Sequence, residues 1–160
     1  MAYDAFLKLD GLDGESTTKG HEKWIEVSSF QWGVDHPVSI TASGRSTGKA
    51  NVHDFKITKP VDASSPKLFL SCVTGKNFDK ASIWVRKAGG DNALPYMKYD
   101  FKGVLITGFE NAASGGDDNP MEEMTLNFTG LDYTYTMQKP DGTAGGAIQV
   151  TYDLKTGAGK

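Results

Sequence analysis

The sequence predicts a mainly β protein, an antiparallel β-barrel with one short flanking α-helix. Two observations lead to this prediction. Apolar and polar residues alternate along several short segments separated by turn-forming residues, which is typical of half-buried strands in an all-β domain. A single stretch, residues 64–75, carries the start and stop signals of a helix. A barrel is favoured because closure removes exposed strand edges.

The predicted helix runs from Ser65 to Thr74. Ser65 suits the N-cap, Pro66 suits the first helical position, and Gly75 can adopt the left-handed conformation that ends a helix. A helix of roughly two to three turns needs tertiary packing to be stable. We expect the packed face to comprise the residues that share one side at helical spacing, which are Leu68, Phe69, Cys72 and Val73.

The strands are predicted where apolar residues recur at every second position. These segments are residues 3–9, 25–34, 53–57, 81–85, 97–106, 124–128, 131–137 and 148–154. The phase of the alternation changes near Ser28 and Ser29, and again at Gly130. One extra residue reverses the facing of all that follow, so we predict a β-bulge at each place. Residues 86–92 are predicted to form a turn.

Composition sets broad limits on function. The 160 residues fit one domain, residues 1–160, and the net charge of −3 with no long basic run argues against nucleic acid as the main partner. The first residues lack the basic and apolar regions of a signal peptide, and no apolar run is long enough to cross a membrane. We therefore expect a protein made in the cytoplasm, for which later export without a cleaved signal stays open. The lone Cys72 cannot form an internal disulfide.

No residue pattern predicts catalysis, a cofactor or a metal. The three histidines are far apart in the sequence without ligand spacing. Gly44 and Gly48 are separated by three residues where a phosphate loop needs four, and Ala50 replaces the magnesium-binding Ser or Thr. We interpret the acids Asp117, Asp118, Glu122 and Glu123 as a solvated loop, since no nucleophile lies beside them.

Residues 41–50 form the most flexible-looking polar stretch, which we expect to project from the barrel. Such a loop contacts another chain or nothing. The residues concerned are Gly44, Arg45, Ser46, Thr47, Gly48 and Lys49. Arg45 and Lys49 are the charges expected to pair, with Asp117 or Asp118 as candidate partners. Gln31 falls on the polar side of its strand, between Phe30 and Trp32, and is a candidate for lining a wet surface.

The chain resembles a known family through short markers in a fixed order, from Phe6 to about Tyr152. These are Gly14-Glu15-Ser16, Trp32-Gly33, Gly48-Lys49, Ser65-Pro66, Gly75-Lys76, the run from Val85 to Gly90, and Thr125-Leu126-Asn127-Phe128. Together they are similar to the haemolysin-coregulated protein (Hcp) family, the tube subunits of type VI secretion systems. The chain ends soon after its last predicted strand, so we expect no fused toxin domain.

The resemblance implies a β-barrel whose copies close into a hexameric ring, with rings stacked into a hollow tube. A contractile sheath would drive this tube, with its spike and baseplate, into a target cell, and effectors could travel in the lumen. Residues 44–49 would then stack rings, and Gln31 would face the lumen. Two alternatives stay open. A monomeric barrel that binds a small molecule predicts a large apolar pocket, and a hydrolase predicts activity that depends on Asp117 or Glu122.

Overall fold

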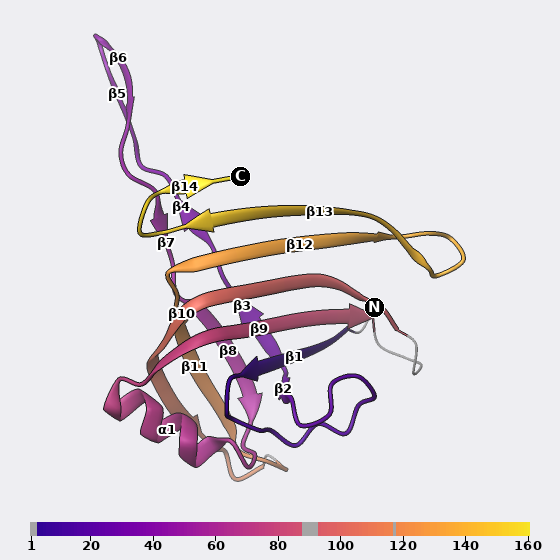
Figure 1. The fold of residues 1–160 in the computed structure, drawn as a ribbon. Coiled ribbons are helices and arrows are strands. Elements are labelled where there is room, and N and C mark those ends of the chain that lie inside the picture. Colours follow the sequence, from indigo (N-terminus) through magenta and orange to yellow (C-terminus); the bar gives the residue numbers. More distant parts are fainter. Residues whose placement is uncertain (1–2, 88–92, 117) are drawn as a thin grey trace.

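The computed structural model describes residues 3–87, 93–116 and 118–160, and within these ranges it is a mainly antiparallel β fold with one short helix (Figure 1). The first eight strands are β1 (Tyr3–Leu9), β2 (Ile25–Val27), β3 (Ser29–Gln31), β4 (Val34–Asp35), β5 (Val38–Thr41), β6 (Gly44–Thr47), β7 (Asn51–Val52) and β8 (Phe55–Pro60). The helix α1 (Ser65–Thr74) follows, and then β9 (Asn77–Lys87), β10 (Pro95–Ala112), β11 (Met121–Asn127), β12 (Gly130–Gln138), β13 (Ala144–Asp153) and β14 (Ala158–Gly159). The predicted class, a β-barrel with one flanking helix, is confirmed.

The long strand β10 organises the barrel. One of its edges pairs with β9, which in turn pairs with β1, and β1 pairs with β2. Its other edge pairs first with β12 and then with β11, so that β13 and β14 continue one sheet while β8 and β3 continue the other. All these strands belong to one continuous 10-stranded sheet, which the bend in β10 divides into two parts. We refer to these parts as the two sheets, and the buried core residues come from both of them.

The change of sheet occurs at Gly103, midway along β10. Gly103 has a φ of 59°, and a Cβ there would lie 2.3 Å from the Thr129 hydroxyl oxygen. Opposite this glycine, β11 ends and β12 begins, and the Thr129 backbone N–H donates to the Lys102 carbonyl at 2.9 Å. The absence of a Cβ at Gly103 therefore allows β10 to bend sharply at this position.

At both places where a bulge is predicted, the chain passes from one sheet to the other. The first break separates β2, which pairs with β1, from β3, which pairs with β8. The second separates β11 from β12 at Phe128 and Thr129. At each break the chain passes from one sheet to the other, and this passage reverses the side chains that face the core. The turn predicted at residues 86–92 lies mostly outside the described residues.

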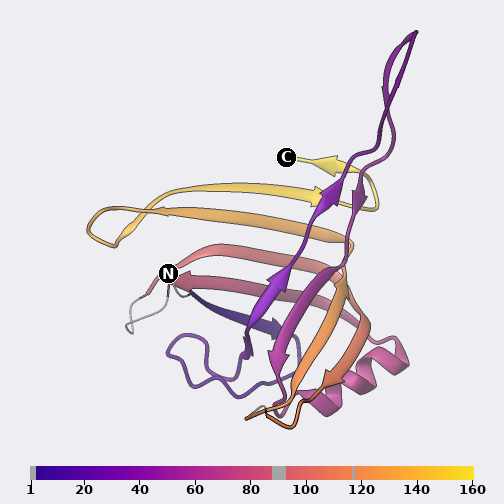
Figure 2. The same ribbon diagram turned by 180° about the vertical axis from the view of Figure 1, so that it is seen from behind.

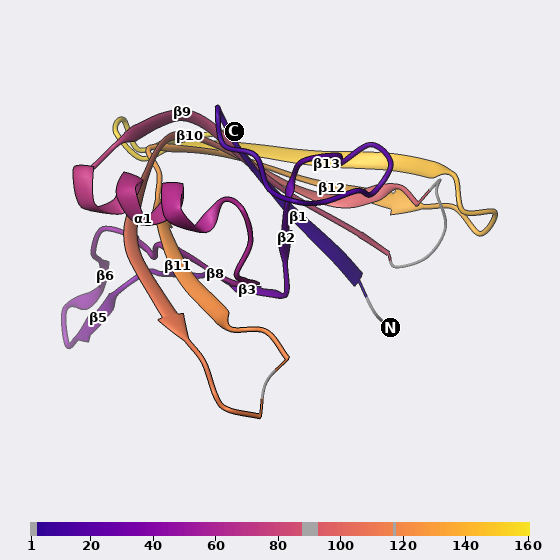
Figure 3. The same cartoon turned by 90° about the horizontal axis from the view of Figure 1, so that it is seen from below.

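Helix α1 has the predicted bounds but a different packed face. Leu68 is fully buried and Ser71 is buried, whereas Phe69 and Val73 are 56% and 67% exposed. The prediction that Val73 packs on the sheet is wrong, because the side marked by Leu68, Ser71 and the half-buried Cys72 faces inward. Phe69 is only partly covered, and its ring lies 6.3 Å from that of Phe109 on β10, centroid to centroid. Figure 3 shows α1 lying across β10, against which it packs.

The start of the helix also differs from the prediction. Ser64, not Ser65, occupies the N-cap position, and its side chain makes no capping hydrogen bond. Ser65 is already helical, and its hydroxyl accepts a hydrogen bond from the backbone N–H of Asp62 at 3.0 Å. Gly75 has a φ of 66° and ends the helix in the left-handed conformation, as predicted.

Two leucines of α1 test this packing as a matched pair. Leu68→Ala removes a fully buried side chain and should lower the free energy of unfolding by about 2–5 kcal/mol. Leu70→Ala removes one that is 58% exposed and should change the free energy of unfolding of the isolated subunit by less than about 0.5 kcal/mol. Denaturant unfolding at subunit concentrations below assembly measures both. Equal losses would show that the helix is seated differently.

Candidate assembly surfaces

The residues predicted to stack rings form a projecting hairpin and not an irregular loop. Strands β5 and β6 pair with each other and with no further strand among the described residues, and the hairpin extends well away from the body (Figures 1 and 2). Ile40 pairs directly with Arg45, and Val38 with Thr47, so these four side chains share one face. Ile40 is 78% exposed. The hairpin thus presents an apolar strip beside the Arg45 guanidinium.

The predicted charge partners are distant within one copy. Arg45 and Lys49 are both exposed, on or just after β6. Asp118 is exposed in the β10–β11 connection, which lies at the opposite end of the body from the hairpin in both views (Figures 1 and 2). Asp117 lies outside the described residues. Pairing between the hairpin and Asp118 can therefore occur only between two copies.

A second surface is the apolar face of β12 and β13. Tyr133 pairs with Val150 and Tyr135 with Ile148, so these residues lie on one face and alternate with polar ones. The face begins in the core at the buried Leu131 and becomes exposed along the strands; Ile148 reaches 61%. Such alternation is the pattern of a strand with one covered face. Half of this face has no cover among the described residues.

An apolar cleft of about 250 Å³ lies where this face meets the other sheet. Among its lining residues are Trp32, Val34, Val52, Val150, Tyr152 and Leu154. The indole N–H of Trp32 is buried and has no hydrogen-bond acceptor among the described residues. Sequence alternation identified most of these residues as apolar strand positions but not that they surround an open space.

Gln31 is exposed at the end of β3, opposite Lys56 of β8. It is not part of the barrel core, so the prediction that it faces a wet surface is compatible with its position. The neighbouring His53 and Asp35 form an exposed hydrogen bond, with 2.6 Å between Nε2 and Oδ2. This end of the β3–β8 sheet is polar, unlike the cleft beside it.

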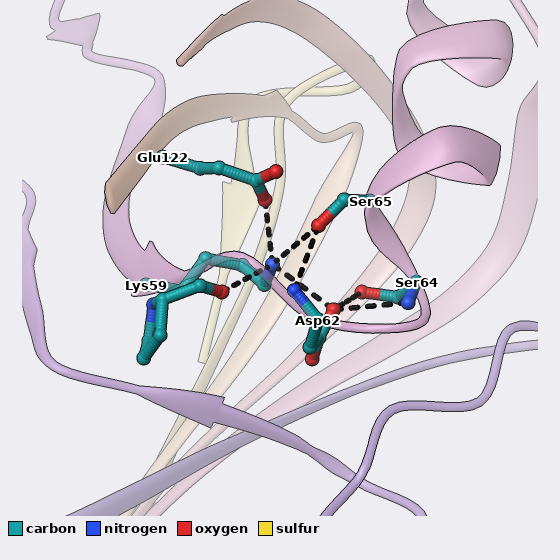
Figure 4. A network of polar contacts seen from close by, with 6 residues as sticks. Lys59, Asp62, Ser64, Ser65 and Glu122 are labelled. Carbon is teal, nitrogen blue, oxygen red and sulfur yellow. Dashed lines mark hydrogen bonds and ion pairs between the residues drawn. The ribbon is translucent and has the colours of Figure 1, made fainter. Parts of the chain in front are cut away.

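A buried polar network anchors the start of α1 (Figure 4). The Lys59 ammonium and the Glu122 carboxylate are both fully buried, with 2.6 Å between Nζ and Oε2. The ammonium also lies 3.2 Å from Asp62 Oδ1 and donates to the Pro60 carbonyl at 2.9 Å. Asp62 in turn accepts hydrogen bonds from the backbone N–H and the hydroxyl of Ser64. The network ties β8 and β11 to the residues that open the helix.

This network corrects the interpretation of the acidic residues. Glu122 is not in a solvated loop, because β11 pairs with β8 in a register that places Glu122 opposite Lys59 in the interior. Glu123 faces outward and pairs with Lys56 at 3.2 Å.

Among the described residues no group of three His, Cys, Asp or Glu side chains is arranged to hold a metal ion. No described helix is long and apolar enough to cross a membrane.

Removing one partner of the buried Lys59–Glu122 pair should destabilise the fold. Lys59→Met leaves the Glu122 carboxylate buried without its cation, and we expect the free energy of unfolding to fall by about 3–5 kcal/mol. The double variant Lys59→Met with Glu122→Leu removes both charges and should recover much of that loss. Denaturant unfolding of the three proteins provides the comparison. A double variant less stable than Lys59→Met would show that the pair is not coupled.

These features define a class: a β-barrel protein with an exposed apolar strand face and a projecting hairpin. The family model described as "Type VI secretion system effector, Hcp" matches residues 6–135. Protein hcp1 of Pseudomonas aeruginosa is 36% identical over 157 residues, which are 97% of each chain.

Solved structures agree. One titled as a type six secretion system protein has a TM-score of 0.92 and 32% identity, covering 99% of this chain and 100% of its own. Hcp1 from Salmonella typhimurium has a TM-score of 0.81 and 31% identity over the same shares of the two chains. The chain belongs to the Hcp family, the secreted proteins that form the tube of type VI secretion systems.

Proposed function

We propose that this chain closes into hexameric rings that stack into a hollow tube, which a contractile sheath with its spike and baseplate propels into a target cell. Family membership supports the tube role, since Hcp proteins assemble with themselves. The observation that carries the proposal is the uncovered apolar face of β12 and β13, which is patterned like a core strand. Residues 1–160 would act as one tube-forming domain, made in the cytoplasm and secreted without a cleaved signal.

The alternative of a monomeric small-molecule binder rests on the apolar cleft. The comparisons do not support it, and the cleft runs into an uncovered strand face that a small ligand would leave exposed. We assign the protein a structural role.

Effectors would be carried in the lumen, with Gln31 as the residue that contacts them. In a Cys72→Ser background, Gln31→Cys in assembled tubes should react with a small maleimide and resist a bulky one that the lumen excludes. Equal reaction with both would show that Gln31 does not face the lumen.

Solution mass tests the ring. Light scattering after size-exclusion chromatography should give a mass of six subunits, each of 17.3 kDa. Electron micrographs of the same fractions should show ring-shaped particles, and concentrated samples should show tubes. A monomer mass over a wide range of concentration, with no rings in micrographs, would overturn the proposal.

The hairpin is the proposed stacking element. Arg45→Glu with Lys49→Glu should leave rings intact but shorten or abolish tubes, because the reversed charges repel the acids they are proposed to meet. Each exposed pair contributes only about 0–1 kcal/mol, but a ring repeats every contact, and added salt should weaken stacking of the unmodified protein. Lys19→Glu with Lys23→Glu makes the same change of net charge on a different exposed loop and serves as the control. Long tubes from the hairpin variant at high protein concentration would refute the role.

A further inference from the structure

Two exposed apolar surfaces of this chain lie at opposite ends of the molecule. One is the outer face of α1, made by Phe69, Leu70 and Val73, which are 56%, 58% and 67% exposed. The other is the cleft between β13 and the β4–β7 pair. In Figures 1 and 2, α1 lies below β9 while β13, β4 and β7 lie at the other end of the body. One molecule therefore cannot bring its own helix to its own cleft.

A head-to-tail ring requires two different surfaces that fit each other on every subunit. The helix face is convex and apolar, and its three residues have the i, i+1 and i+4 spacing of a helix seated in a groove. The cleft is concave and lined largely by apolar and aromatic side chains. Within α1, these three residues are the large apolar ones that are exposed.

The cleft also holds an unsatisfied donor. The buried indole N–H of Trp32 has no acceptor among the described residues. A buried donor of this kind is costly unless a partner supplies an acceptor. The last turn of a helix ends in backbone carbonyl groups that lack intrahelical partners. In α1 the Ser71 and Cys72 carbonyls already accept hydrogen bonds from the Lys76 and Gly75 backbone N–H groups. The carbonyls of Val73 and Thr74 are therefore the acceptors that a helix seated in the cleft could offer to the indole.

We propose that the Phe69, Leu70 and Val73 face of α1 docks in the apolar cleft beside Trp32 and Val150 of the next copy in the ring. This inference rests on the proposed ring but adds which two surfaces meet. It also explains why the outward face of a short helix is apolar. The partner is a second copy of the same chain.

Cross-linking tests the contact directly. In a Cys72→Ser background, which leaves no native thiol, Val73→Cys is combined with Val150→Cys. A short bifunctional maleimide should then produce a ladder of linked subunits on a denaturing gel, because each copy offers one site to each neighbour. The matched control combines Lys67→Cys with Val150→Cys, since Lys67 is exposed on a different side of α1. It should give no ladder.

A second pair of variants tests the energetic role. Val73→Asp places a charge in the proposed contact and should raise the protein concentration needed for rings by at least about tenfold. Thr17→Asp adds the same charge at an exposed position of the β1–β2 loop, outside both proposed surfaces, and should leave assembly nearly unchanged. Circular dichroism would show that both variants fold.

The outcomes separate the two proposals. Rings by light scattering without a Val73–Val150 ladder would overturn this contact and leave the ring intact. Linked dimers from Val73→Cys alone would show helix-to-helix pairing and would also overturn it. If the unmodified protein forms no rings, both the proposed function and this contact fail.

Discussion

The bend in strand β10 at Gly103 constrains the arrangement of the rest of the chain. Because β10 pairs with β12 before the bend and with β11 after it, every later pairing is assigned to one of two sheets. Strands β13 and β14 extend the first sheet, and β8 and β3 extend the second. The apolar cleft lies between residues of β12 and β13 on one side and of β4 and β7 on the other. The same bend that encloses the core therefore also produces the surface that we assign to assembly.

The sequence located most strands because alternation depends only on which face of a strand is covered. It did not show which sheet each strand joins. The phase changes near Ser28 and Gly130 were interpreted as bulges, whereas the structure shows that the chain changes sheets there. A local bulge and a change of sheet reverse the side chains in the same way, so periodicity cannot distinguish them. Only the pairing partners, which are distant in the sequence, can do so.

The face of α1 and the buried pair could not be predicted for a different reason: burial depends on what approaches a residue. Phe69 and Val73 are apolar and at helical spacing, yet the sheet covers the side that carries Leu68 and Ser71. Lys59 continues the buried alternation of Phe55 and Ile57, and Glu122 precedes the buried Met124 by two positions. The position of a charged residue in the buried phase of each strand could have indicated the pair from the sequence. Once Ile57 is paired with Met124, antiparallel register places Lys59 opposite Glu122.

Apolar side chains that face outward at both ends of one subunit have a consequence for assembly. Burying each patch is favourable by roughly 25 cal/mol per Å² of apolar surface, but ordering two partners offsets part of that gain. In an open row of subunits joined head to tail, one helix face and one cleft are always left uncovered at the ends. Closing the row covers both without immobilising another subunit. The contact that we propose between α1 and the cleft therefore favours a closed ring over any shorter open assembly.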